Sequence, residues 1–298
     1  MPDRMLITGG TGLLGTDLTQ FFSSGYKVCS TGSRDLDIRD YDQLGRFFED
    51  IQPAYVLHAA AIADVDRCEI DQKEAMAVNA LGAENVARVC RESGAVMVYY
   101  STDYVFNGED DTPYTENDKT DPVNFYGRSK LEGEQRVMEV LDNVVVLRIA
   151  WLFGRGEKCF IARLIERGVR QIGAGKTGGG GEEIVVISDQ IGTPTYTRDI
   201  ARQTEALLRG RMSGLFHCTS EGETSRQGVA EIIFERLNMK VELTVRRRDE
   251  FQWRAPRPAY TVLENAGLNE CNMNLMPDFR TAINRYLEDR SDNNNIRV

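Results

Sequence analysis

The amino-acid sequence predicts an α/β fold, in which a doubly wound parallel sheet is followed by a smaller lobe. Three observations predict it. Short, almost wholly apolar segments alternate with amphipathic ones, and the first apolar segment ends in a glycine-rich turn. The chain of 298 residues, 41% of them hydrophobic, is also long enough to bury a large core. Apolar runs of this kind are typical of parallel strands buried on both faces.

The first apolar run covers 5–8 and leads into the turn GGTGLLG, after which an amphipathic stretch extends to about Ser24. A second strand is expected over 26–30. Strand, turn, helix and strand together make a βαβ unit, the building block of a Rossmann-type sheet. The same alternation predicts further strands over 55–58, 96–100 and 144–149, and helices near 42–50, 71–92 and 126–141.

The glycine turn predicts a dinucleotide site. Gly9, Gly12 and Gly15 give the pattern GxxGxxG between the first strand and the first helix, with Thr11, Leu13 and Leu14 between them. Glycines let the backbone turn tightly and approach a pyrophosphate. The helix N-terminus that follows offers free N–H groups and the positive end of its dipole.

The choice of dinucleotide depends on the residues after the second strand, which ends without the acid that usually holds the ribose of NAD. Ser33 and Arg34 follow at once, so NADP(H) is favoured. NAD(H) stays open, because Asp35 is also available to the ribose. Asp37 and Ile38 are expected beside the adenine.

These observations divide the chain. Residues 1–150 are expected to form the dinucleotide-binding domain, with segments near 185–212 returning to it, and 151–298 to form mostly a discontinuous second lobe. The glycine run GAGKTGGGG at 173–181 predicts a flexible loop or hairpin. It is not expected to bind phosphate, because a strand-like segment at 183–188 follows where a P-loop requires a helix.

Composition excludes several classes of function. The formal net charge of −10 argues against binding to nucleic acid or to an anionic membrane. Two histidines and six scattered cysteines without a CxxC pair give no metal-type spacing. No stretch has the length of a membrane span or the pattern of a leader, so a cytoplasmic protein is expected.

Tyr126 and Lys130 predict a catalytic site. They are one helical turn apart and share a face, so the lysine favours ionisation of a phenol whose ordinary pKa is near 10. Thr102 ends a strand-like segment, where open α/β sheets bind ligands, and its hydroxyl can hydrogen-bond a carbonyl oxygen. The alternative is structural: an accidental surface pair, and a threonine that satisfies turn backbone.

Several motifs occur in order and together resemble the extended short-chain dehydrogenase/reductase family, most closely its dTDP-4-dehydrorhamnose reductases. The resemblance covers about residues 5–260. The motifs that carry it are GGTGLLG (9–15), AAAIADVDRCE (59–69), STDYVFNG (101–108), YGRSKLEGE (126–134), RIAWLFG (148–154), DQIGTPTY (189–196) and RP (257–258).

The resemblance implies NADP(H)-dependent reduction of the C4 ketone of a nucleotide-activated deoxysugar, dTDP-4-dehydro-L-rhamnose giving dTDP-L-rhamnose. Tyr126 would supply the proton, Thr102 would orient the carbonyl, and Lys130 would tune the tyrosine and hold the nicotinamide ribose. The small residues Ala59, Ala60 and Ala61 would lie along the cofactor. Residues implied to contact the sugar nucleotide are Asp103, Tyr104, Trp151 and Arg257.

Other functions remain open. Ala150 and Phe153 depart from the family's usual residues in the substrate lobe, so another sugar nucleotide is the first alternative. A noncatalytic subunit resembling the regulatory subunit of methionine adenosyltransferase is the second. A homodimer is possible, and some relatives bridge dimers through a metal. Asp17 is a counterpart of one bridging acid, but no metal site is predicted.

Overall fold

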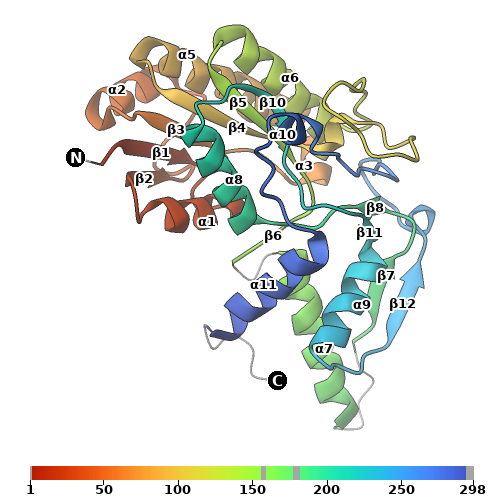
Figure 1. The fold of residues 1–298 in the computed structure, drawn as a ribbon. Helices are drawn as coiled ribbons and strands as arrows, with labels where there is room; N and C mark the ends of the chain where they lie inside the picture. Colours follow the sequence, from red (N-terminus) through yellow and green to blue (C-terminus); the bar gives the residue numbers. More distant parts are fainter. Residues whose placement is uncertain (1, 156–158, 177–181, 293–298) are drawn as a thin grey trace.

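A computed structural model describes residues 2–155, 159–176 and 182–292, which form two lobes (Figure 1). The first lobe is built on a six-stranded parallel sheet with the order β10-β5-β4-β3-β1-β2. In its register Met5 lies opposite Val28 on one side and Tyr55 on the other. The strands are β1 (Arg4–Thr8), β2 (Lys27–Thr31), β3 (Tyr55–His58), β4 (Val96–Thr102), β5 (Val144–Ile149) and β10 (Gly214–His217).

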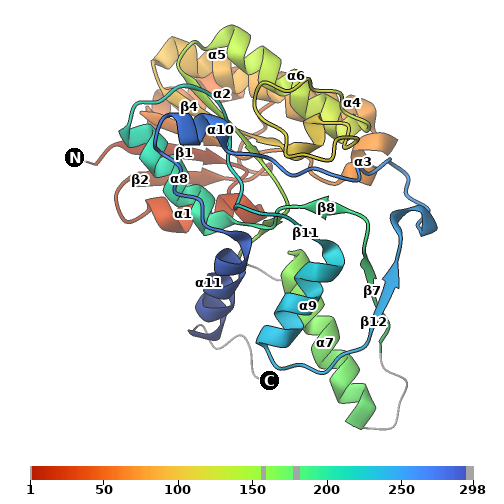
Figure 2. The same cartoon turned by 45° about the vertical axis from the view of Figure 1, so that its right-hand side comes forward.

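Helices cover both faces of this sheet (Figures 1 and 2). Apolar side chains of α1 (Leu13–Phe22) and α8 (Thr197–Arg209) pack with the strands in one core cluster. Those of α2 (Tyr41–Ile51), α5 (Ala83–Ser93) and α6 (Phe125–Val140) pack in another. The expectation of a doubly wound Rossmann-type sheet is confirmed, and so are the five strands and the helices expected in it.

The helix expected near 71–92 has more structure than its periodicity predicts. It consists of α4 (Gln72–Met76), a π-helical turn η1 (Ala77–Gly82) and α5, and the short α3 (Val65–Ile70) precedes it. A π-turn inserts an extra residue into a helix and redirects the side chains that follow. Here it directs Asn79 toward α6, as described below.

The second lobe packs α7 (Phe160–Lys176), α9 (Arg226–Arg236) and α11 (Phe279–Asp292) around its own core (Figure 2). Three two-stranded ladders complete it: β6 (Leu152–Phe153) with β9 (Thr195–Tyr196), β7 (Ile184–Ile187) with β12 (Leu243–Arg246), and β8 (Ile191–Gly192) with β11 (Thr224–Ser225). The remaining short elements are η2 (Asp103–Val105), η3 (Arg248–Glu250) and α10 (Ala266–Glu270).

The loop expected over 173–181 is wrong in its first part, because α7 continues through Lys176. Residues 177–181 lie outside the described residues. The apolar face of α7 buries Ile161, Leu164 and Ile165, and such packing outweighs the poor helix propensity of two glycines near its end. The strand expected over 183–188 is confirmed by β7.

Within the described parts of the chain, no helix combines the length and the apolar character that a membrane crossing requires.

Candidate active site

The carboxyl ends of β1, β2 and β3 border a groove of about 520 Å³. Neighbouring strands lie on both sides of β1, so the groove is at the point where the strand order reverses, the usual ligand site of an open α/β sheet. Nine of the residues expected to bind the cofactor line it: Gly9, Thr11, Gly12, Ser33, Asp37, Ile38, Ala59, Ala60 and Ala61.

The glycines of the turn are required by close backbone contacts. Gly9 has φ of +72°, and a Cβ there would lie 2.5 Å from the Ala60 nitrogen. A Cβ on Gly15 would lie 2.6 Å from the Cα of Gly10. Helix α1 begins at Leu13, and its N-cap Gly12 provides no side-chain hydrogen bond. The first N–H groups of the helix are therefore left for an anion, which fits the pyrophosphate of a dinucleotide.

The remaining expected cofactor residues have different positions. Leu13 and Leu14 lie in the first turn of α1, where Leu14 is buried in the core. Arg34 is exposed and is not among the residues that line the groove. Arg39 does line it, and its Nη2 lies 2.6 Å from Oδ2 of Asp37. No sequence pattern marked Arg39, because a surface arginine has no characteristic spacing.

The start of α6 is fixed by short-range contacts. The Asn124 side chain caps the helix by accepting a hydrogen bond from the Gly127 nitrogen at 2.9 Å. It also donates to the Pro256 carbonyl at 3.0 Å, which ties the helix start to the second lobe. Gly127 faces the Tyr104 carbonyl so closely that a Cβ would clash with it. These contacts bring Tyr126 to the end of β4, where its ring centroid lies 5.9 Å from that of Tyr104.

Thr102 and Asp103 are buried at the end of β4, and Tyr126 beside them is half-buried. The Thr102 hydroxyl donates to Oδ1 of Asp103 at 3.0 Å and accepts from the Tyr104 nitrogen at 3.2 Å. Burial raises the pKa of Asp103 to about 6, against the effect of the Thr261 and Thr102 hydroxyls. Burial also raises the pKa of Tyr126, which the Thr102 hydroxyl acts to lower. The phenol therefore holds its proton at neutral pH, as a proton donor must.

Lys130 lies one turn further along α6 and is 2% exposed. Its Nζ donates to the Tyr100 carbonyl at 2.7 Å and lies 4.1 Å above the centroid of the Tyr99 ring. Burial lowers its pKa to about 7. The lysine is thus held against β4 with its charge only partly compensated, which suits a group that assists proton transfer and binds a polar ligand.

Asn79 supports this arrangement, and sequence reasoning missed it. Its side chain accepts from the Ile62 nitrogen at 2.8 Å and donates to the Ser129 hydroxyl at 2.9 Å. It joins the loop after β3 to α6, so it links the cofactor groove to the helix of Tyr126 and Lys130. Only the π-turn places Asn79 there, and no simple periodicity marks such a turn.

Trp151 lies between β5 and β6, at the boundary of the lobes. Its φ of +43° is unusual for a bulky residue, and its indole is 9% exposed. Its buried Nε1 has no hydrogen-bond partner within the part of the chain that the structure describes. The guanidinium carbon of Arg226 lies 3.6 Å from the ring centroid. Sequence reasoning missed Arg226, because it starts a helix far along the chain with no motif around it.

Arg257 is partnered. Its Nη2 lies 3.1 Å from Oδ1 of Asp66 on α3, and its Nη1 donates to the Ala255 carbonyl at 3.0 Å. The segment that contains Arg257 is therefore tied to α3 of the first lobe. Its charge still reaches the site, because it acts to lower the pKa of Tyr104.

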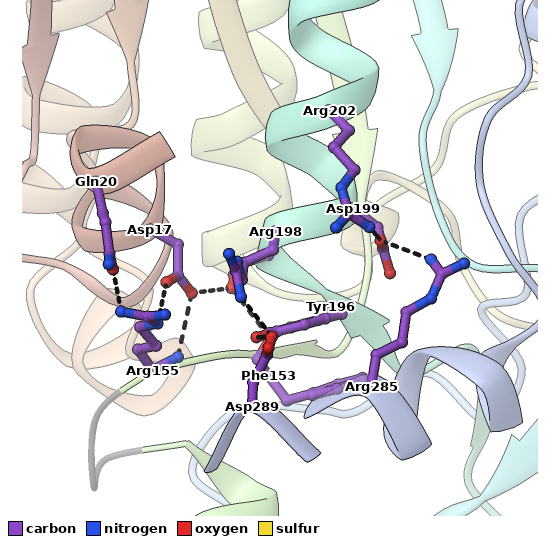
Figure 3. Close-up of polar contacts among 11 residues, drawn as sticks. Asp17, Gln20, Phe153, Arg155, Tyr196, Arg198, Asp199, Arg202, Arg285 and Asp289 are labelled. Carbon is purple, nitrogen blue, oxygen red and sulfur yellow. Dashed lines mark hydrogen bonds and ion pairs between the residues drawn. The ribbon is translucent and has the colours of Figure 1, made fainter. Parts of the chain in front are cut away.

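Asp17 is buried in a polar cluster at the junction of the lobes (Figure 3). Its Oδ2 accepts from the Arg155 nitrogen at 3.1 Å and from the Thr197 hydroxyl. Nearby, Asp289 of α11 accepts from the Tyr196 hydroxyl at 2.8 Å. No group of three or more His, Cys, Asp or Glu residues suited to a metal ion occurs in the described ranges.

Comparisons with known proteins agree on one family. The family model of the RmlD substrate binding domain matches residues 3–291. The chain is 36% identical to a dTDP-4-dehydrorhamnose reductase of Mycolicibacterium smegmatis, over 95% of this chain and 84% of that protein. It is 34% identical to a dTDP-4-keto-6-deoxy-D-glucose reductase of Streptomyces niveus, over 95% of this chain and 96% of that protein. A crystal structure of the Bacillus anthracis dTDP-4-dehydrorhamnose reductase in complex with NADP superposes with a TM-score of 0.91, at 33% identity, covering 97% of this chain and 100% of that one.

Proposed function

Because the chain belongs to the family of the RmlD substrate binding domain, we propose that it reduces the C4 ketone of dTDP-4-dehydro-L-rhamnose with NADP(H) to give dTDP-L-rhamnose. One observation carries the proposal: buried Thr102, half-buried Tyr126 and buried Lys130 all lie against the carboxyl end of β4. This is the arrangement that carbonyl reduction needs, with a proton donor next to a cofactor site.

In this proposal the bound nicotinamide supplies the hydride. Tyr126 gives its proton to the developing C4 alkoxide, and Thr102 hydrogen-bonds the same oxygen. Lys130 stabilises the phenolate that Tyr126 becomes when it loses its proton, and it also holds the nicotinamide ribose. Its position beside β4 and its lowered pKa of about 7 support a role at neutral pH.

The cofactor is held by the glycine turn 9–15 and by the small residues 59–61. Ser33 and Arg34 were expected at the 2′-phosphate, and among the described residues Arg39 and Arg67 are the cations that line the groove. We propose NADP(H) over NAD(H), as the Bacillus anthracis relative is in complex with NADP. Replacing Arg34 and Arg39 singly by alanine tests this. Loss of the contact with the 2′-phosphate is expected to raise KM for NADPH and to leave KM for NADH unchanged.

The sugar nucleotide is bound by Asp103, Tyr104, Trp151 and Arg257, between a dinucleotide-binding domain (1–150 with segments near 185–212) and a second lobe (mostly 151–298). Helix α8 packs on α1, and β10 pairs with β5, which supports the return of later segments to the first domain.

The test is to supply dTDP-4-dehydro-L-rhamnose with NADPH and follow nicotinamide oxidation. Tyr126→Phe is expected to lower kcat by about 10²- to 10⁴-fold while NADPH still binds, since general acid catalysis contributes that much. Tyr41→Phe is the matched control, because its hydroxyl contacts only Glu92 on the surface of the first lobe. Full turnover by Tyr126→Phe would refute the assignment of the proton donor.

The first alternative is another dTDP-4-keto sugar, which the Streptomyces niveus relative and the residues Ala150 and Phe153 favour. Absence of turnover on the rhamnose precursor, with turnover of another 4-keto sugar, would select it. A noncatalytic regulatory subunit would instead co-purify with a catalytic partner and reduce none of these sugars.

A further inference from the structure

Arg226 covers one face of Trp151. Its guanidinium carbon lies 3.6 Å from the centroid of the indole and 4.8 Å from that of Phe160. A guanidinium over the face of an indole is a favourable cation–π contact. Arginine is the first residue of α9, which Ser225 caps by accepting a hydrogen bond from the Gly228 nitrogen at 2.9 Å.

Gly192 covers the opposite face. A Cβ built on it would be nearest to Cε2 of Trp151, 2.6 Å from Nε1 and 2.7 Å from Cζ2. If Gly192 lay in the plane of the ring, at its edge, this Cβ would be closer to Nε1 and Cζ2 than to Cε2. The order of the distances is the reverse, so the Gly192 backbone lies above the ring plane. The Arg226 guanidinium and this backbone each lie over the ring, so they occupy opposite faces.

The fold places both groups there. Strands β8 and β11 pair antiparallel with Thr224 opposite Gly192, so the chain that carries Gly192 and the chain that leads into Arg226 lie side by side. Trp151 is inserted between them, and its carbonyl accepts from the Thr195 nitrogen at 3.2 Å. One face of the indole is thus closed by backbone, and the other is closed only by a side chain that can move.

Arg226 is a cation without an anion. Throughout residues 2–155, 159–176 and 182–292, no hydrogen bond or ion pair engages its guanidinium, whereas Arg257 is paired with Asp66. Its guanidinium lies on Trp151 at the boundary of the lobes, and its charge acts to lower the pKa of Asp103 and of Tyr104. An unpaired, partly buried guanidinium at such a place is suited to bidentate binding of phosphate.

We propose that Arg226 binds the diphosphate of the sugar nucleotide, and that in the ligand-free chain it occupies the face of Trp151 on which the deoxysugar packs. The inference rests on the proposed function. When the sugar binds, its apolar face replaces the guanidinium on the indole, and the guanidinium pairs with the diphosphate. The sugar contact with Trp151 and the diphosphate contact with Arg226 therefore form together, and only with a ligand that carries both groups.

The chain contains two tryptophans, so Trp253→Phe leaves Trp151 as the only indole to report on this exchange. In that background, Arg226→Ala is expected to raise the acrylamide quenching constant of Trp151 by about twofold without ligand, because one face is uncovered. Arg163→Ala is the control, since Arg163 is an exposed neighbour whose charge acts on Arg226. Unchanged quenching in Arg226→Ala would overturn the covering of Trp151.

Binding of dTDP and thymidine to the same variants tests the diphosphate contact. Arg226→Ala is expected to weaken dTDP binding by about 10- to 100-fold, the range for hydrogen bonds to a charged group, and to leave thymidine and NADPH binding unchanged. Arg226→Lys should recover part of the dTDP affinity. Equal dTDP affinity in parent and Arg226→Ala, or a parent that binds no dTDP, would overturn the inference.

Turnover separates the two ideas. A parent that binds dTDP through Arg226 but does not reduce dTDP-4-dehydro-L-rhamnose refutes the proposed sugar and supports this inference. A parent that reduces the sugar, with KM unchanged in Arg226→Ala, supports the proposed function and refutes this inference. Retained NADPH binding shows that each variant is folded.

Discussion

Replacing Glu134 by alanine is expected to destabilise α6, the helix that carries Tyr126 and Lys130. Glu134 lies one turn beyond Lys130 on α6 and pairs with Arg148 of β5 through two near-parallel bonds, Nη2–Oε2 at 2.8 Å and Nε–Oε1 at 3.1 Å. The side chains are 1% and 5% exposed. Alanine would leave the guanidinium buried without an anion.

The loss is expected to be large because nothing nearby can replace the carboxylate. The Arg148 guanidinium lies 5.2 Å from the centroid of Phe106, and its Nη1 is 3.5 Å from Nε2 of His217. Burial lowers the pKa of His217 to about 3, so this histidine is neutral and supplies no negative charge. Removing one partner of a buried pair costs about 3–5 kcal/mol of unfolding free energy.

The matched control is Glu132→Ala on the same helix. Glu132 pairs with Arg136 at 2.7 Å, but the two side chains are 36% and 34% exposed. Such an i,i+4 surface pair contributes only about 0.3–0.5 kcal/mol. Replacing both Glu134 and Arg148 by methionine is expected to recover most of the loss, because a buried pair can be exchanged for apolar side chains of similar volume.

The assay is urea unfolding followed by circular dichroism, with the free energy of unfolding compared among the parent and the three variants. If Glu134→Ala lost no more stability than Glu132→Ala, the reasoning from burial and from the missing counter-charge would be refuted.

Further predictions concern titration and packing. The folded pKa of Asp103 is raised to about 6 from 3.8, so the stability of the parent relative to Asp103→Asn should fall as pH rises from about 4 to 6; equal pH profiles by thermal unfolding would refute this. The folded pKa of Lys130 is lowered to about 7 from 10.5, so the cofactor-free parent should gain stability relative to Lys130→Met as pH rises from about 7 to 10, and a loss would contradict it. Gly192→Ala should cost about 1–3 kcal/mol through its clash with Trp151, whereas Gly45→Ala, with open space in α2, should stabilise by about 0.5–1 kcal/mol; both are measured by urea unfolding.

Much of the first lobe and its family were predictable from local sequence. Buried parallel strands read as apolar runs whatever surrounds them, and the glycine turn has a fixed place between the first strand and the first helix. The resemblance to the extended short-chain reductases is confirmed by the family match over residues 3–291. The helix through Lys176 was missed because glycines lower helix propensity, while packing against the second core overrides it.

The residues of the candidate site also differ in whether the local sequence could predict them. Tyr126, Lys130 and Thr102 could be proposed from the sequence because the pattern that marks them is local, one helical turn and one strand end. Arg226 was not, because it reaches Trp151 only through the pairing of β8 with β11, two segments far apart in the chain.

By itself the sequence determined the order of the elements, the glycine turn and the one-turn spacing of Tyr126 and Lys130, since these follow from contacts between near neighbours. Only the tertiary structure decided which charges are paired and which are left free. Arg257 is paired with Asp66, whereas Arg226 has no such partner among the described residues. Burial shifts the pKa values of Asp103 and Lys130 toward neutrality. Desolvation and ion pairing depend on groups brought together from distant parts of the chain, so no local pattern encodes them.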